Sequence, residues 1–288
     1  MVTIVGFLIV VGSVLGGFMM AGGHVGALIH PSEIVTIGGA ALGALVVMSP
    51  LSVLKNLVKG IISTFTGDKY GKQAYAELFS LLYEIFRKAR KDGLLAMEIH
   101  LSNPHDSAIF QRYPRIVKNH HVTDFIKGAL GPFIDGSVTP GQLRGLLDVE
   151  IHAVEEEHHA PTGVLSKTAD ALPGFGIVAA VLGIVITMEH INGPVEEIGH
   201  KVGAALVGTF LGILMSYGFI APLVGKLEMM GVAESCFFRT IAAAVLAFVE
   251  SMPPKFAIEV ARRGIPSDVR PSDSEMEKMF KEAEQHNE

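Results

Sequence analysis

The sequence predicts an all-α membrane protein, with four transmembrane helices and a helical cytoplasmic domain inserted between the second and third helices. Hydrophobic residues make up 49% of the 288 residues and charged residues 18%, a mixture typical of a chain with a membrane part and a water-exposed part. Four apolar stretches are each long enough, at about 1.5 Å per residue, to cross about 30 Å of hydrocarbon. Because open strands and loops leave backbone groups unpaired in lipid, we expect these stretches to be helical.

Residues 1–54 hold the first two predicted membrane helices. Residues 2–21 are uncharged and lack the positively charged start of a cleaved signal peptide, so we expect them to be a membrane helix. Residues 34–54 form the second helix, with Pro50 near its end. Each helix carries two glycines four residues apart, a spacing that allows close helix contact.

Residues 55–170 carry charges throughout and keep a helical period, so they are predicted to form the inserted cytoplasmic domain. Residues 75–96 have the pattern of an amphipathic helix. A short helix is expected over 122–130. Another is expected over 139–159, where Thr139 is the predicted N-cap.

Residues 171–225 contain the third and fourth predicted membrane helices, over 171–188 and 202–224, and neither carries a charged residue. The segment between them contains Asn-Gly-Pro, which is typical of a turn, so the two helices should form a hairpin. We expect no carboxylate to be buried within the four membrane helices. Since a self-contained proton carrier usually has one, an ion-binding carboxylate is expected to come from a partner.

Residues 226–288 form the predicted C-terminal cytoplasmic segment. Helices are expected over 235–250 and 255–263, followed by a polar tail from residue 272 that we expect to be frayed. Pro-Pro at 253–254 is expected to end the first of these helices.

The topology follows from the 23 lysines and arginines. Fourteen fall within residues 55–167 and eight from residue 226 onward, while Lys201 alone lies elsewhere. The positive-inside rule therefore places the inserted domain and the C-terminus in the cytoplasm, and four membrane helices then place the N-terminus there as well.

Composition and motifs argue against several other classes of protein. The net charge of −6 gives no support to nucleic-acid binding, and the single cysteine, Cys236, excludes an intrachain disulfide and a cysteine zinc cluster. The twelve histidines show no HExxH spacing, and the sequence has neither a P-loop nor a GxSxG motif. We therefore expect no metal or cofactor and no enzymatic activity.

Two strings in the hairpin carry a family resemblance. PGFGIVAAVLGIVITM, which begins at Pro173, and GTFLGILMSYGFIAPL, which contains Thr209 and Pro222, resemble the MotA family of flagellar stator subunits, and the likeness extends over nearly the whole chain. The resemblance implies a proton-conducting subunit of the bacterial flagellar motor in the inner membrane, surrounded by lipid. It also implies the partner MotB, whose membrane helix carries the essential aspartate, in a ring of five subunits around two MotB chains.

The same resemblance assigns roles within the membrane. The family's functional prolines fall on Pro173 and Pro222, where a missing N–H would free a carbonyl and create a hinge, although such prolines can also simply kink a helix. The family's ion-path threonine falls on Thr209, and the alternative is a hydroxyl that bonds back to its own helix. Ala180 stands where sodium-driven relatives carry a second threonine, which favours the proton over sodium.

The resemblance also points to a rotor-facing surface. Arg90 and Glu98, in the string RKARKDGLLAME, match the family's rotor-facing arginine and glutamate, and Glu150 matches a further acidic position. The implied rotor partner is the switch protein FliG, and an ordinary solvated charged face is the alternative.

An ExbB/TolQ-like energy-transducing subunit is the nearest alternative function. A scaffold or a secondary transporter acting alone would need an intramembrane charge of its own.

Overall fold

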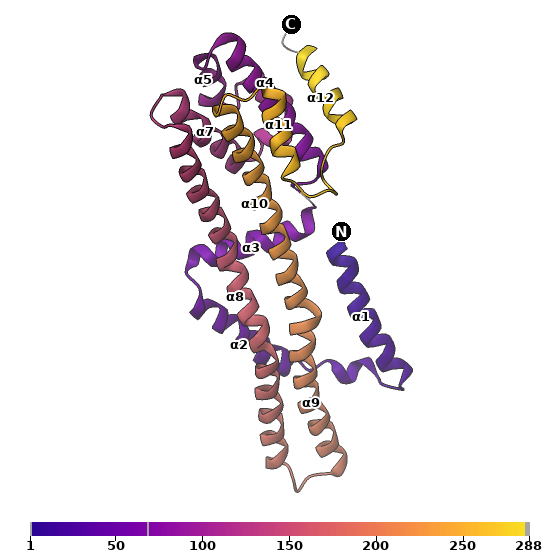
Figure 1. Cartoon of the computed structure of the whole chain (residues 1–288). Helices are drawn as coiled ribbons and strands as arrows, with labels where there is room; N and C mark the ends of the chain where they lie inside the picture. Colours follow the sequence, from indigo (N-terminus) through magenta and orange to yellow (C-terminus); the bar gives the residue numbers. More distant parts are fainter. Residues whose placement is uncertain (1, 68, 286–288) are drawn as a thin grey trace. The chain divides into compact units, whose positions relative to one another are not determined.

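A computed structural model describes residues 2–67 and 69–285, and the described residues form helices and their connections (Figure 1). Four helical stretches are long and apolar enough to cross a membrane: Val2–Met20, Val25–Met48, Pro140–Glu189 and Val195–Val249. This confirms the predicted helical fold, with two N-terminal spans and two spans after a helical middle region.

The chain divides into two compact units. Unit 1 combines Met1–Gly67 with Glu157–Met230, and unit 2 combines Asp68–Glu156 with Gly231–Glu288. Both divisions after residue 67 fall inside long helices, because α8 runs over Pro140–Glu189 and α10 over Ala221–Val249. The predicted separate helices at 139–159 and 171–188 are therefore one helix, which continues through two internal prolines.

Unit 1 begins with α1 (Val2–Met20), the short η1 (Val25–Leu28) and α2 (Pro31–Met48). The predicted end of the second membrane helix at residue 54 is wrong. Ser49 is extended, with φ −125° and ψ 128°, because the ring of Pro50 disfavours a helical residue before it. A separate helix, α3 (Leu51–Thr66), follows and lies transverse to α9 in Figure 1.

The second half of unit 1 contains the membrane part of α8, then α9 (Val195–Ile213) and η3 (Leu214–Ile220). The η3 segment is π-helical, with wider turns than an α-helix. Its last bond runs from the Ala221 N–H to the Ser216 carbonyl, five residues back. The chain then continues directly into α10, so the predicted fourth membrane helix contains a π-helical interruption.

Unit 2 is built around α4 (Lys72–Asp92), most of which is buried. Phe86 of α4 stacks on Phe248 of α10, with ring centroids 4.2 Å apart. Glu84 is 1% exposed and is satisfied by Arg112 at 2.8 Å and by the Tyr113 hydroxyl at 2.6 Å. The predicted helix over 75–96 is two helices, because Gly93 at φ +90° ends α4. The remaining helices are α5 (Leu95–Ser102), η2 (Phe110–Arg112), α6 (Pro114–Val117), α7 (His120–Ile134), α11 (Pro254–Arg263) and α12 (Asp273–Gln285).

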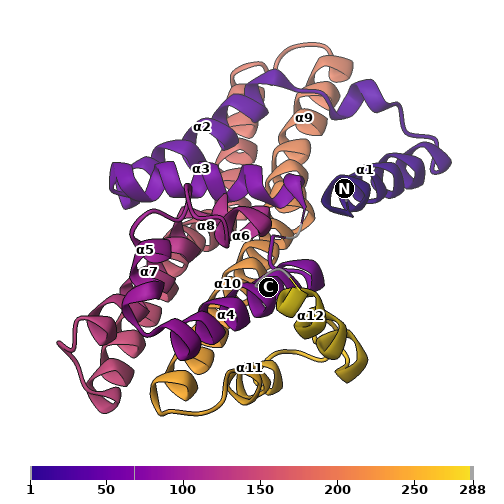
Figure 2. The same ribbon diagram turned by 90° about the horizontal axis from the view of Figure 1, so that it is seen from above.

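The C-terminal tail is ordered as α12, so the expectation of a frayed tail is wrong over the described residues. Figures 1 and 2 show α12 beside α4. Phe280 packs on Tyr83 with ring centroids 4.5 Å apart, and the Tyr83 hydroxyl donates to Glu284 at 2.7 Å. These contacts supply the burial that a polar helix lacks on its own.

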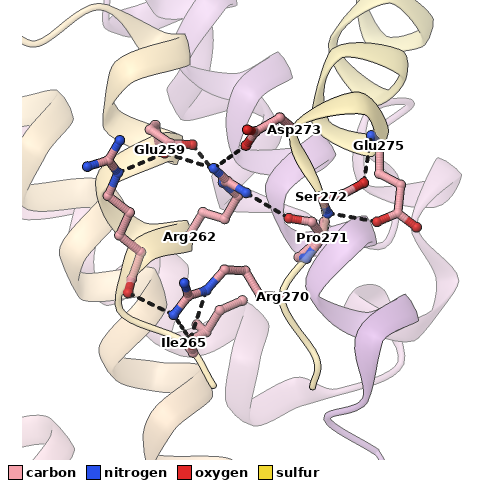
Figure 3. A network of polar contacts seen from close by, with 9 residues as sticks. Glu259, Arg262, Ile265, Arg270, Pro271, Ser272, Asp273 and Glu275 are labelled. Atoms are coloured by element: carbon pink, nitrogen blue, oxygen red, sulfur yellow. Dashed lines mark hydrogen bonds and ion pairs between the residues drawn. The ribbon is translucent and has the colours of Figure 1, made fainter. Parts of the chain in front are cut away.

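An ionic network holds the connection between α11 and α12 (Figure 3). Arg262 donates to both oxygens of Glu259, at 2.7 and 2.9 Å, to the Pro271 carbonyl at 2.8 Å and to Asp273 at 2.5 Å. These hydrogen bonds from Arg262 lower the pKa of the Glu259 carboxyl to about 2. The network thereby fixes the start of α12 against the last turn of α11.

Candidate functional site

Backbone contact between α8 and α9 forms the centre of the candidate site in unit 1. A Cβ atom on Gly176 would lie 2.9 Å from the Gly208 carbonyl oxygen, and one on Gly212 would lie 2.7 Å from the Leu172 carbonyl oxygen. No side chain fits between atoms this close. Glycine at these two positions is therefore what lets the helices meet backbone to backbone.

Ala180 and Thr209 lie at this same contact. A Cβ on Gly208 would lie 3.3 Å from the Ala180 nitrogen, and a Cβ on Gly176 would lie 3.3 Å from the Thr209 Cα. The structure thus brings together the two residues that the sequence proposed for the ion path.

The Thr209 hydroxyl forms no hydrogen bond with any residue in 2–67 or 69–285, and the side chain is half-buried. By contrast, Thr187 in α8 donates to the Gly183 carbonyl at 2.7 Å, one turn earlier in its own helix. The alternative that Thr209 bonds back to its helix is therefore not found. Its oxygen remains available to an ion or to a polar group of another chain.

Pro173 lies inside α8, where its missing N–H leaves the carbonyl four residues earlier without a helical donor. That carbonyl belongs to Ala169, and it accepts a hydrogen bond of 2.7 Å from the Ser216 hydroxyl. Ser216 is 1% exposed and lies in η3. The Ser216 side chain, on one arm of the helical hairpin, therefore satisfies the Ala169 carbonyl that Pro173 frees on the other arm.

Pro222 is exposed in the first turn of α10, directly after η3. A π-helical segment next to a proline is a common way for a long helix to absorb the lost hydrogen bond and to bend. Because Ser216 contributes its carbonyl to η3 and its hydroxyl to Ala169, the surroundings of the two prolines are physically connected.

One carboxylate overturns the expectation that none is buried in the membrane helices. Glu33 lies in the first turn of α2, which begins at Pro31 rather than at residue 34, and it is 7% exposed. A Cβ on Gly208 would lie 3.0 Å from Glu33 Oε2, so the carboxylate lies against α9 beside Thr209. The sequence signal was a proline followed by a carboxylate at the start of an apolar run, a pattern typical of a helix N-terminus.

The three proposed rotor-facing residues lie in unit 2. Arg90 is exposed in the last turn of α4 and donates to the Ser251 carbonyl at 2.6 Å, in a turn where Ser251 has φ +69°. Glu98 is exposed in α5. Glu150 is half-buried, and its carboxylate oxygens lie 3.7 Å from a Cβ built on Gly128 of α7. No hydrogen bond or ion pair joins these three residues to one another within residues 2–67 and 69–285.

The sequence interpretation missed Ser216 as well as Glu33. Ser216 is the only serine in the apolar run 202–224, which was a usable signal, because a hydroxyl in such a run needs an acceptor. Its acceptor lies 47 residues away in the chain, so the pairing itself could not be read from the sequence.

The fold and the site define a helical, multi-span membrane channel subunit. Residues 4–93 match the model of the motility protein A N-terminal region, and residues 117–232 match that of the MotA/TolQ/ExbB proton channel family. Motility protein A of Salmonella typhimurium is 38% identical over 277 residues, which cover 96% of this chain and 94% of the relative. The chain therefore belongs to the MotA family of flagellar stator subunits, which are channel proteins and not enzymes.

Two solved structures share the fold. The structure of C. jejuni MotAB matches with a TM-score of 0.77 and 22% identity, covering 94% of this chain and 98% of that one. The flagellar MotAB stator complex from Bacillus subtilis matches with a TM-score of 0.73 and 25% identity, covering 89% and 92%. These relatives favour a stator subunit over the ExbB/TolQ-like alternative.

Proposed function

We propose that this chain conducts protons together with MotB and converts their flow into torque on the flagellar rotor. The observation that supports this best is the Thr209 hydroxyl at the α8–α9 contact, which has no hydrogen-bond partner within residues 2–67 and 69–285. A MotB helix packed at this contact would bring its aspartate near that hydroxyl. Five copies of the chain around two MotB chains, in the bacterial inner membrane with both termini in the cytoplasm, is the assembly that the family resemblance suggests.

The proton gradient supplies the energy for the cycle, and the cost of charge in hydrocarbon couples proton binding and release to a change in packing. An ionised carboxylate is expensive in the membrane and a protonated one is much less so, so proton binding and release switch the packing that the aspartate favours. In this chain the switch would act on the Ser216–Ala169 hydrogen bond, one turn before Pro173, and on Pro222, where the helices lack regular α-helical hydrogen bonding.

Torque transfer would use the exposed charges of unit 2 against FliG. Arg90 and Glu98 are exposed and of opposite sign, so they can complement an opposite pair on a rotor surface. Arg90→Glu and Glu98→Lys should each reduce swimming while leaving membrane insertion and MotB binding intact. Lys91→Glu is the matched control, because Lys91 is exposed and adjacent to Arg90 but is not one of the residues to which the resemblance assigns a rotor-facing role.

Compensating charge changes on the rotor protein FliG provide a second test of the proposed rotor interface. A charge reversal on FliG should restore part of the swimming speed of the Arg90 or Glu98 variant and none of any loss seen with the Lys91 control. Equal defects in all three variants, with no rescue, would mean that these charges are ordinary surface groups.

The coupling ion is proposed to be the proton. Ala180 offers no hydroxyl, and a sodium ion needs several oxygen ligands to repay its dehydration, whereas a proton needs one acceptor. Swimming should therefore persist in sodium-free medium and stop when a protonophore collapses the proton gradient. A swimming speed that rises steeply and saturates with external sodium at fixed pH would contradict this proposal.

A further inference from the structure

The exposed face of α3 carries a row of apolar side chains with two lysines beside it, an arrangement that is rare on a water-exposed helix. Four apolar side chains stay exposed there: Leu51 at 68%, Val58 at 57%, Ile62 at 58% and Phe65 at 39%. At about 100° per residue these four fall within an arc of about 60°. They form a continuous apolar stripe along the whole helix.

The two lysines of α3 border this stripe. Lys55 and Lys59 lie about 20° and 60° beyond Ile62 around the helix, and both are exposed. Neither forms an ion pair or a hydrogen bond with any residue in 2–67 or 69–285. Polar Ser52 and Asn56 follow still further around, so the order across the exposed face is apolar, then basic, then polar.

The opposite face of α3 is already occupied by its own unit. Leu57 is 3% exposed and packs with Leu165, Leu223 and Leu227, and a Cβ on Gly60 would lie 3.2 Å from Leu227. The apolar stripe therefore does not serve the core of unit 1, and it needs a different neighbour.

The placement of α3 within unit 1 says where that neighbour lies. Two residues separate the start of α3 from the end of α2 at Met48, and near its other end the Thr64 carbonyl accepts a hydrogen bond of 3.3 Å from Thr3, in the first turn of α1. Both ends of α3 thus meet ends of predicted membrane spans, and α3 lies transverse to α9 in Figure 1. A helix in this position runs along the membrane surface.

We propose that the exposed face of α3 lies in the membrane interface and binds anionic phospholipid. The stripe enters the acyl region, and Lys55 and Lys59 extend beside it to the phosphates of anionic headgroups, as long basic side chains do at interfaces. This inference rests on the chain being a multi-pass membrane protein and does not depend on the coupling ion, on MotB or on the rotor.

The chain offers a clean optical test because it contains no tryptophan. Val58→Trp places one fluorophore on the stripe, and Asn56→Trp places a matched one on the polar side of the same helix. The full chain, purified and reconstituted in phosphatidylcholine vesicles, is titrated with acyl-chain-brominated lipid. Trp fluorescence in the Val58 variant should be quenched at least about twice as strongly as in the Asn56 variant, because an interfacial apolar face reaches the acyl boundary.

The headgroup preference is measured with the same fluorophore. Brominated phosphatidylglycerol should quench the Val58→Trp fluorescence at a mole fraction at least about fivefold lower than brominated phosphatidylcholine, because one lysine near an anionic surface already accounts for about that factor. Adding Lys55→Gln and Lys59→Gln should remove that preference, whereas Lys278→Gln with Lys281→Gln on α12 should not. Circular dichroism and elution volume verify that each variant is folded.

Three results would overturn the inference. Fluorescence of the Val58 variant that neither brominated lipid quenches would mean that protein, such as a second copy of the chain, covers the stripe. Equal quenching of the two tryptophan variants would remove the interfacial orientation. A phosphatidylglycerol preference that survives loss of both α3 lysines would show that these lysines do not bind the headgroups.

Discussion

The hydrogen bond between Ser216 and Ala169 can be tested directly, because the Ala169 carbonyl lacks a helical donor only on account of Pro173. In Ser216→Ala the Ala169 carbonyl loses its 2.7 Å donor and stays buried, since Ala169 is 3% exposed. A buried acceptor left unpaired costs about 1–3 kcal/mol, while hydrogen bonds between membrane helices average about 0.6 and reach about 1.7 kcal/mol. We therefore expect Ser216→Ala to lower the free energy of unfolding by about 1 kcal/mol.

The assay is reversible denaturation of the purified chain in detergent, combined with a double-mutant cycle. In Pro173→Ala the helix regains an N–H that can bond the Ala169 carbonyl, so removing the Ser216 hydroxyl should then cost almost nothing. Thr168→Val is a matched control, because its hydroxyl bonds the Val164 carbonyl one turn back in its own helix. An equal cost of Ser216→Ala in both Pro173 backgrounds would refute the reasoning.

Three further changes test other parts of the molecule. Gly212→Ala puts a Cβ 2.7 Å from the Leu172 carbonyl oxygen, so it should cost more than about 1–3 kcal/mol and reduce the yield of folded protein; normal yield and melting temperature would show that the helices separate freely. Pro222→Ala restores a backbone donor and should leave assembly intact while lowering torque measured on tethered cells; unchanged torque would make the proline purely structural. Arg262 holds the folded pKa of Glu259 at about 2, below the value of about 4.5 for an unperturbed carboxyl, so the stabilisation from this ion pair should be present above pH 4.5 and be lost as the pH falls toward 2. Glu259→Gln should therefore flatten the melting temperature between these pH values. Parallel profiles of the variant and the unchanged chain would exclude the Arg262–Glu259 network as the cause of the pH dependence.

The four apolar spans could be predicted because length and hydropathy alone decide them. The break between α2 and α3 could not be placed correctly from hydropathy, since Leu51 and Leu54 continue the apolar run past Pro50. What separates the two helices is the backbone conformation of Ser49, which the following proline imposes. The local proline signal was stronger here than the apolar pattern.

The order of the C-terminal tail was missed for a different reason. Most residues of α12 are polar, which suggested fraying, yet Met276 and Ala283 are buried at a helical spacing of seven. At the start of the helix the Ser272 N–H also donates to the Glu275 carboxylate at 2.7 Å, and the Glu275 N–H donates to the Ser272 hydroxyl at 3.3 Å (Figure 3). This capping box was visible in the sequence as Ser-Asp-Ser-Glu, and it marks a helix start.

The candidate site divides in the same way. Ala180 and Thr209 were predicted from the family pattern, and the structure places them at one contact. The roles proposed for them, and those proposed for Arg90 and Glu98, stay predictions until the variants are measured. Glu33 and Ser216 depend on contacts between segments far apart in the chain, which periodicity and motifs do not report.

The backbone contact between α8 and α9 has a mechanical consequence. Where Gly176 and Gly212 meet, there are no side chains whose rotamers could adjust to a small displacement. Attraction between atoms falls steeply with distance, so a gap of about 0.5–1 Å forfeits about a quarter to a half of it. The contact is therefore stiff, and α8 and α9 should move as one rigid body at this point. Bending of the hairpin would therefore concentrate just beyond this contact, in the wide turns of η3.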